Sequence, residues 1–324
     1  MRLLVVGELN PDLVLGDYRS FPRPGQDVLV EDASLTLGSA SAICAMGLAR
    51  LGNRVRFASK VGCDQWGDFC IRELESRGIE TSWVRRDPGV KTGLTVAITC
   101  AADRALVTHL GAIASFCAAD LEDGVMEGCT HLHISSYFLQ AGLRPDCRAL
   151  FARAHANGMT TSLDPGFDPA ERWEAGLRDT LREVDVFFPN EVELRCLGGA
   201  EDPAECLRRL GNGRTQVLAK MGAAGCQALE NGRLVSVPAF PVKTADTTGA
   251  GDSFNAGFLH AWLRGRSLQD AMQYGAACGA LSTRAMGGTG SQATAEEAET
   301  MMHSGTVSIR SRIPEGETCQ GGHS

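Results

Sequence analysis

Short apolar runs alternate with stretches of helical periodicity along most of the chain. Arg2–Gly7 is a largely apolar run that ends in glycine, which predicts a buried first strand. After residue 128 the predicted strands are His131–Ser135, Thr160–Leu163, Val184–Phe188 and Gln216–Ala219. The helices expected around them are 146–157, 171–182, 191–197 and 202–210. This alternation predicts an α/β fold in which helices cover both faces of a mostly parallel sheet, with the site at the carboxyl ends of the strands.

A second kind of segment consists of short alternating stretches that read as strands joined by turns or loops. The alternating stretches are Leu13–Leu15, Val28–Val30, Thr92–Thr99 and Arg104–Leu110. The last two read as a hairpin, and a proline-rich connection separates the first two. We therefore expect a small sheet, distinct from the main one, from residues 13–36 and 91–110.

The remaining periodic stretches complete the main domain, which we expect to comprise residues 1–12, 37–90 and 111–304. Its further elements are a strand over Val55–Val61 and helices over 38–51, 67–77, Leu268–Met286 and Ala293–Met302. Residues 305–324 show no apolar periodicity and are predicted to be disordered.

One further helix follows a glycine-rich turn. Phe254, Phe258 and Trp262 recur every four residues, which predicts a helix that starts near Gly251 or Asp252. The first amides of a helix lack partners inside it and carry the positive end of its dipole, so Gly249-Ala250-Gly251 predicts an anion site. Asp252 adds a carboxylate beside that site. It either caps the helix or takes part in chemistry.

Composition narrows the function classes. The chain has 324 residues, 44% of them hydrophobic, as in ordinary soluble proteins, and its net charge of −8 argues against nucleic acid or an anionic membrane as the main partner. The start of the chain does not read as a signal peptide, so we expect a cytoplasmic protein. The 12 cysteines include no Cys-x-x-Cys pair, which favours reduced, buried thiols. His131 and His133 could share a metal, but we favour a structural role.

Two common nucleotide motifs are absent from the sequence. Neither Gly-x-Gly-x-x-Gly after the first strand nor a Gly-x-x-x-x-Gly-Lys-Ser/Thr loop occurs. Instead, the fourteen residues Asp246–Leu259 resemble, position by position, the C-terminal signature of the PfkB (ribokinase-like) family of carbohydrate kinases. Similarity to the family extends over about residues 1–300. It implies a ribokinase-like, three-layer, doubly wound α/β fold in which the small sheet is a lid over the substrate.

The resemblance also implies a reaction. It makes Asp252 the base that removes a proton from a substrate hydroxyl, while the amides of Gly249, Ala250 and Gly251 stabilise charge on the transferred phosphoryl group. The expected activity is ATP-dependent phosphorylation of a primary hydroxyl on a sugar or sugar-like molecule. Phosphoryl transfer depends mainly on positioning and charge stabilisation, which such a turn supplies.

On the acceptor side, the family places a sugar-binding aspartate where Asp12 stands; the alternative is a turn residue after Pro11. The N-terminal family motif maps onto Gly38, Ser39 and Ile43, but Ser39 replaces a glycine and Ile43 replaces a sugar-binding asparagine. This departure leaves the acceptor open. Arg104 of the hairpin either reaches the substrate or is a solvated turn residue.

On the nucleotide side, the expected residues follow strand ends, as does Asp164-Pro165. Asn190-x-x-Glu193 matches the motif that the family uses to hold Mg²⁺ through water, although acids in a first helical turn are common. The nucleotide contacts are expected from Asn190, Glu193, Lys220, Gly222, Gly225 and Thr248. A salt-bridged Lys220 is the alternative for that residue. Asp246 is expected beside a monovalent cation such as K⁺.

Two rival functions stay open from the sequence. A nucleoside kinase of the same family would suit the apolar Ile43, and a non-catalytic sugar or nucleotide sensor could share the fold. Retention of Asp252, Asn190 and Glu193 speaks against the sensor. The lid also predicts a homodimer, because exposed strand edges are usually covered.

Overall fold

The structure is a computed structural model that describes residues 1–16, 23–25, 27–99, 104–174 and 176–306, without the side chains of Thr99, Arg104 and Thr306. Its main sheet has the strand order β13-β12-β11-β10-β9-β8-β1-β4-β5. The strands are β1 (Arg2–Val6), β4 (Arg54–Gly62), β5 (Glu80–Asp87), β8 (His131–Ile134), β9 (Thr160–Leu163), β10 (Val186–Phe187), β11 (Gln216–Lys220), β12 (Cys226–Glu230) and β13 (Arg233–Val237). From β11 to β5 neighbouring strands pair parallel, and the hairpin β12–β13 adds an antiparallel edge.

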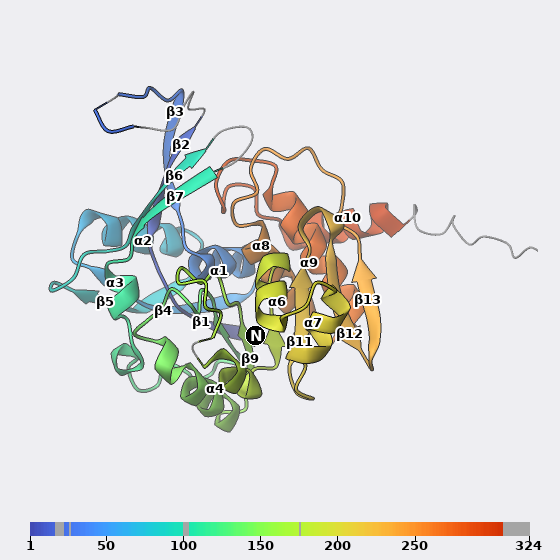
Figure 1. Ribbon diagram of the computed structural model, residues 1–324. Helices are drawn as coiled ribbons and strands as arrows, with labels where there is room; N and C mark the ends of the chain where they lie inside the picture. The colour runs from blue at the N-terminus through green and yellow to red at the C-terminus, as the bar shows by residue number, and fades with distance from the viewer. Residues whose placement is uncertain (17–22, 26, 100–103, 175, 307–324) are drawn as a thin grey trace, which may run out of the picture.

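Helices cover both faces of this sheet (Figure 1). The α-helices are α1 (Ala40–Arg50), α2 (Gln65–Ser76), α3 (Ala112–Ser115), α4 (Cys147–Ala156), α5 (Leu177–Thr180), α6 (Glu191–Gly198), α7 (Pro203–Leu210), α8 (Ala250–Trp262), α9 (Leu268–Ser282) and α10 (Ala295–Thr306). Alternate residues of β1 enter different cores: Leu3 and Val5 pack with α1, α2, α8 and α9, whereas Leu4 and Val6 pack with α4, α6 and α7. The predicted three-layer, doubly wound α/β fold is confirmed.

A separate four-stranded sheet has the order β3-β2-β6-β7 and stands apart from the main sheet (Figure 1). Its strands are β2 (Pro11–Gly16), β3 (Asp32–Leu37), β6 (Leu94–Thr99) and β7 (Arg104–His109). The expected strand at Val28–Val30 is wrong, because β3 begins only at Asp32. The hairpin of β6 and β7 is present where it was predicted.

Some other elements differ from the expectation. The helix predicted over 171–182 shortens to α5 and a 3₁₀ turn, because the Asp168 carboxylate accepts the N–H groups of Ala170, Arg172 and Trp173 and fixes a loop instead. Strand β5 and the hairpin β12–β13 were not predicted. Helix α10 runs to Thr306, two residues into the predicted tail, and residues 307–324 lie outside the described residues. Within the described residues, no helix combines the length and apolar character that a membrane span requires.

Candidate active site

The side chains singled out in the sequence gather at the carboxyl ends of the parallel strands of the main sheet. Parallel strands bring their carboxyl ends to the same edge, and β1, β8, β9, β10 and β11 all end there. The residues at or just beyond these ends are Glu8, Asp12, Ser136, Asp164, Asn190, Glu193 and Lys220.

Helix α8 opens at this edge with a tight turn. Gly249 has φ 71°, and a Cβ there would lie 2.8 Å from the Cα of Gly288, so conformation and space both require glycine. The N–H of Ala250 donates to the carbonyl of Thr247, at 3.2 Å. The amides that follow in the first turn have no acceptor one turn earlier in the helix. The turn therefore presents N–H groups and a positive helix dipole to an incoming anion.

Asp252 lies in the first turn of α8, and the N-cap of this helix is Gly249, which excludes the capping role considered for Asp252. Burial raises the pKa of the Asp252 carboxyl well above its usual range, and the negative charge of Asp164 raises that pKa further, whereas Lys220 opposes the shift. A carboxylate with raised proton affinity suits a general base.

Lys220 ends β11 and reaches toward α8. Its Nζ lies 2.5 Å from Oδ2 of Asp164, and 3.3 Å from the position that a Cβ on Gly251 would occupy. The salt bridge considered as an alternative is therefore present, and it holds the ammonium against the start of α8. Burial lowers the pKa of Lys220, but the charges of Asp164 and Glu193 outweigh it, so that the pKa lies above its usual value.

The turn after β11 uses its two glycines differently. Gly222 has φ 54°, and a Cβ there would meet no atom within 4 Å. Gly225 has φ 93°, and a Cβ there would lie 2.0 Å from the carbonyl oxygen of Val237. Gly225 thus allows close packing on β13, while Gly222 leaves open space beside the strand end.

Asn190 and Glu193 form a reciprocal cap at the start of α6. The Oδ1 of Asn190 accepts the N–H of Glu193 at 2.9 Å, and the two carboxylate oxygens of Glu193 accept the N–H and Nδ2 of Asn190, both at 2.8 Å. Burial, together with the charge of Asp164, raises the pKa of Glu193 to about 7. The motif therefore has a structural role in this helix.

The same carboxylate limits how a metal could bind. Both oxygens of Glu193 have partners, and no cluster of three acidic, histidine or cysteine side chains able to hold a metal occurs in the described part of the chain. Mg²⁺ keeps several waters and takes few carboxylates directly, so this donor set fits a water-bridged ion. Mutual repulsion among Asp164, Glu193 and Asp252 further favours a cation nearby.

Asp246 ties two loops together. Its Oδ1 accepts the N–H and hydroxyl of Thr248, and its Oδ2 accepts the N–H of Gly287 at 2.8 Å. These hydrogen bonds fix the loop that leads into Gly249. They leave the role of Thr248 at a nucleotide and that of Asp246 beside K⁺ as predictions.

Asp12 and Gly38 meet at the acceptor side. A Cβ on Gly38 would lie 1.9 Å from Oδ1 of Asp12, so only glycine leaves room for this carboxylate. The Nδ2 of Asn10 donates to Asp12 at 3.1 Å and to Oγ1 of Thr95 at 3.3 Å. Asn10 thus ties the Asp12 carboxylate to Thr95 of the small sheet.

The other predicted acceptor residues are placed less directly. Ser39 has φ 67°, rare outside glycine, and its hydroxyl accepts the N–H of Ala42 and donates to the carbonyl of Glu8. Ile43 is 4% exposed, and its side chain borders Gly249 and Gly288 at the anion turn. The backbone of Arg104 lies in β7, and its side chain lies outside the described residues.

Sequence reasoning missed Glu8. It is 2% exposed, and its carboxylate accepts the N–H and hydroxyl of Ser41 and the hydroxyl of Ser136. Burial raises its pKa, and these hydrogen bonds oppose the rise. A glutamate that ends a buried strand was the available signal, but its partners are more than thirty residues away in the sequence.

Asn255 was missed as well. It lies one turn beyond Asp252 on α8, is 0% exposed, and donates from Nδ2 to Oδ2 of Asp164 at 2.7 Å. Its position on the face shared with Asp252 was readable from the helical period. Its partner on β9 was not.

Known proteins share both the sequence pattern and the architecture. A model of the pfkB family carbohydrate kinases matches residues 1–295. The chain belongs to this family. It is 30% identical to an ATP-dependent ribose-1-phosphate kinase of Halopiger xanaduensis, over 87% of this chain and 92% of that protein. It is 31% identical to a 2-dehydro-3-deoxygluconokinase of Bacillus subtilis, over 80% and 84% of the two chains.

A solved structure shares the fold. A fructokinase from Xylella fastidiosa superposes with a TM-score of 0.80 at 23% identity, covering 94% of this chain and 99% of the other. Membership of the family confirms the predicted enzyme class, a carbohydrate kinase. The individual site residues remain predictions.

Proposed function

We propose that this pfkB-family kinase transfers the γ-phosphoryl group of ATP to a hydroxyl of a sugar or sugar-like molecule, with Asp252 as general base. The observation that carries the proposal is the placement of Asp252. It is buried in the first turn of α8, beside amides without helical partners, with the Lys220 ammonium against Gly251. A base, an anion-binding turn and a cation are thereby combined at one point.

The step balances without further reagents. Asp252 takes the proton from the acceptor hydroxyl as its oxygen forms a bond to the γ-phosphorus. The bond from that phosphorus to the bridging oxygen breaks, and ADP leaves with the electron pair. The amides of Gly249, Ala250 and Gly251 stand where charge develops on the transferred group, although Ala250 must first give up its bond to Thr247.

Nucleotide and metal would lie on the side of β10 and β11. Glu193 and Asn190 would hold Mg²⁺ through water, and the ion would neutralise charge on the phosphates when bound. Gly222, with open space beside it, and Thr248 would contact the nucleotide, and Gly225 shapes the turn. The expectation that K⁺ binds beside Asp246 is kept as part of the proposal.

The acceptor would lie between Asp12 and Asp252. Relatives of at least 30% identity act, by their names, on ribose 1-phosphate and on 2-dehydro-3-deoxygluconate, which favours a sugar derivative over a nucleoside. Gly38 and Ser39 shape this side, and Ile43 lines the floor of the anion turn rather than offering a hydrogen bond. Arg104, whose backbone lies in β7, is kept as a proposed acceptor contact.

We also propose that the small sheet is a lid and a dimer contact. Across its four strands, the ladder Thr36–Asp12–Thr95–Thr108 lies on the face that bears Asp12. The neighbouring ladder, Leu35–Leu13–Val96–Val107, lies on the opposite face and is apolar throughout. Leu35 and Val107 are 37% and 59% exposed. An apolar face turned away from the site suits a second copy of the chain.

The deciding experiment measures ADP release from ATP and Mg²⁺ across a panel of sugars, sugar phosphates, sugar acids and nucleosides. Wild type should release ADP only with certain acceptors, and Asp252→Asn should lose roughly 10²–10⁴-fold in turnover with near-normal ATP affinity. Retained turnover in the variant would remove Asp252 from the base role. Tight binding of ATP without turnover on any acceptor would instead indicate a sensor.

A further inference from the structure

Asp164 is a buried carboxylate to which the reaction above gives no role. It follows β9 and is 4% exposed. Its Oδ2 accepts from Nζ of Lys220 at 2.5 Å and from Nδ2 of Asn255 at 2.7 Å, while its Oδ1 accepts the N–H of Gly166 at 3.0 Å. The carboxylate thus joins the ends of β9 and β11 to helix α8.

Stability alone does not account for this arrangement. A buried ion pair is expensive to desolvate, and apolar residues of similar volume are often as stable or more so. Asn255 adds a further cost, because its Oδ1 is buried without a hydrogen-bond partner in the described structure. The Asn255 amide is oriented so that its NH₂ group donates to Asp164, and this orientation leaves its Oδ1 without a partner. Such a cost is typical of functional sites.

The geometry shows what the pair holds in place. Lysine has a long flexible side chain, and the ammonium of Lys220 has three acids near it: Asp164, Glu193 and Asp252. A direct pair between Lys220 and Asp252 would stabilise the ionised base and weaken its pull on a proton. The contact with Asp164 holds the ammonium beside Gly251 instead, at the turn where phosphoryl charge would develop.

We propose that Asp164, itself held by Asn255, is a positioning residue that keeps the Lys220 ammonium at the start of α8 and away from Asp252. The proposal rests on the function proposed above, because it assigns the position of Lys220 a purpose in phosphoryl transfer. It assigns Asp164 no contact with the reacting atoms.

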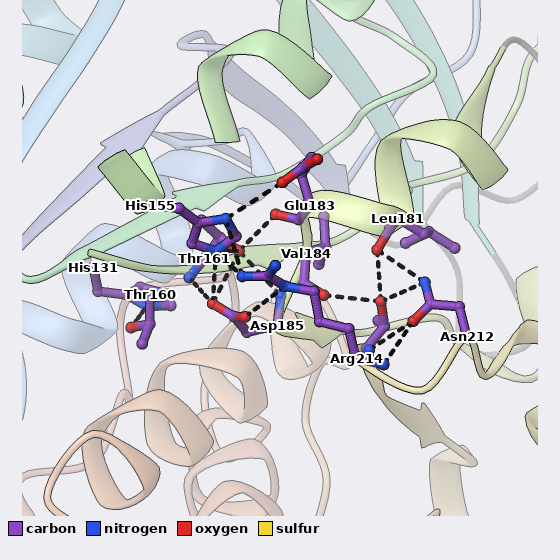
Figure 2. Close-up of polar contacts among 11 residues, drawn as sticks. His131, His155, Thr160, Thr161, Leu181, Glu183, Val184, Asp185, Asn212 and Arg214 are labelled. Carbon is purple, nitrogen blue, oxygen red and sulfur yellow. Dashed lines mark hydrogen bonds and ion pairs between the residues drawn. The ribbon is translucent and has the colours of Figure 1, made fainter. Parts of the chain in front are cut away.

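The test is Asp164→Asn, which removes the charge at nearly constant shape. The matched control is Asp185→Asn at the opposite end of the strands, where that carboxylate also pairs with a cation, Arg214, and accepts a hydrogen bond from His155 (Figure 2). Both variants lose one partly or fully buried negative charge. Only the first should affect Lys220.

Lysine side-chain NMR gives a readout that needs no turnover. The lysines of the chain are Lys60, Lys91, Lys220 and Lys243. Lys60 is bonded to Asp120 at 2.6 Å and to the carbonyl of Ser115, so its ammonium serves as an internal reference. We expect exchange-protected ammonium signals from Lys60 and Lys220 in wild type and in Asp185→Asn. In Asp164→Asn the signal of Lys220 alone should vanish or shift.

Kinetics gives the second readout. With an acceptor found in the panel, Asp164→Asn should lower kcat at least 10-fold and change the KM of the acceptor less than 3-fold, while Asp185→Asn changes neither. An unchanged Lys220 signal, or an equal loss in both variants, would overturn the proposal. If wild type itself releases no ADP, the proposed function fails, and the NMR result still decides the role of Asp164.

Should Asp164→Asn fail to fold, Asn255→Ala takes its place. It keeps both charges and removes only the hydrogen bond to Asp164, so we expect the same loss of protection at Lys220 and a smaller fall in kcat. An unaltered Lys220 signal in that folded variant would contradict the assignment of Asn255 as the support of Asp164.

Discussion

At the scale of single residues, Asp252 shows a conflict between function and stability. Its carboxyl is buried, so that its ionised form is disfavoured in the folded protein. The folded pKa therefore lies above the unfolded one. A group of this kind contributes full stability below its unfolded pKa, and this contribution is lost as pH rises through the folded pKa.

We therefore expect Asp252→Asn to be more stable than wild type at neutral and alkaline pH. The amide cannot ionise, so the variant escapes that loss, and the melting temperature should rise by about 2 °C or more. At pH 4 the difference should shrink. Thermal melts of both proteins from pH 4 to 9 measure it, and a variant less stable than wild type at every pH would contradict the burial argument.

Ser39 makes the opposite kind of prediction. Its φ of 67° strains a side-chain residue by about 1–3 kcal/mol, whereas exchanging a serine cap for glycine costs only a few tenths of a kcal/mol. Ser39→Gly should therefore stabilise the protein by about 1 kcal/mol. Ser39→Ala keeps the strain and loses the hydroxyl that accepts from Ala42, so it should destabilise by about 1 kcal/mol. Urea unfolding of both variants checks the sign, and equal effects would refute the strain.

The relative positions of site residues could be predicted where their neighbours are close in the sequence. Asp252 and Gly249 lie within one turn of a helix that the spacing of Phe254 and Phe258 predicts, so their relation follows from the sequence order. Glu8 depends on Ser41 and Ser136, and Asp164 depends on Lys220 and Asn255. These contacts form only when separate strands align, and no local period indicates them.

At the scale of elements, hydrophobic period predicted the buried strands and long helices, because burial on one or both faces repeats regularly. It was wrong over 171–182. There the Asp168 carboxylate accepts three loop N–H groups, and both Glu171 and Trp173 adopt positive φ. It also failed for β5, whose exposed and buried positions follow no clean alternation. Side-chain hydrogen bonds can override a weak helical pattern.

The small sheet supports a prediction at the same scale. If its apolar ladder is a dimer contact, Val107→Asp should place charges in that contact and give monomers, because a desolvated charge without a partner is costly. Val107 is exposed, so the fold should be retained. Sedimentation at several concentrations gives the mass of wild type and variant. Glu191→Gln, on the exposed side of α6, is a control that should not alter it.

A wild-type protein that sediments as a monomer at every concentration would remove the dimer. The apolar ladder would then need another partner. The only remaining support for the lid would be the position of Asp12 on the opposite face of the small sheet. A variant that stays dimeric while wild type dimerises would place the contact elsewhere.

At the scale of the whole molecule, the carboxyl and amino ends of the parallel strands carry different kinds of polar cluster. The carboxyl edge collects acids whose pKa values are raised, notably Glu8, Glu193 and Asp252. The opposite edge holds a satisfied network, in which Asp185 accepts from the N–H of Thr161, from His155 and from Arg214 (Figure 2). The first end carries the proposed site, and the second carries a network of paired polar groups.

The family resemblance predicted the cluster at the carboxyl ends of the strands. Nothing in the sequence predicted the network around Asp185. Signature residues stay close in sequence, as in Asp246–Leu259, and so can be recognised without a structure. The network at Asp185 joins the end of α4, the start of β9 and the loop before β11. No member stands out in the sequence, and only the register of the strands brings them together.

This network gives a prediction with a definite pH sign. Burial would raise the pKa of Asp185, but the hydrogen bonds from His155 and Thr161 outweigh it and hold that pKa below its usual value. The stabilisation is therefore present above the unfolded pKa and is lost as pH falls through the folded one. Asp185→Asn should cost about 1 kcal/mol at pH 7, and the difference from wild type should vanish toward pH 3. Urea unfolding across that range measures it, with kinase activity expected to be unchanged at pH 7. A penalty that persists at pH 3 would mean that packing, and not the charge of Asp185, stabilises this edge.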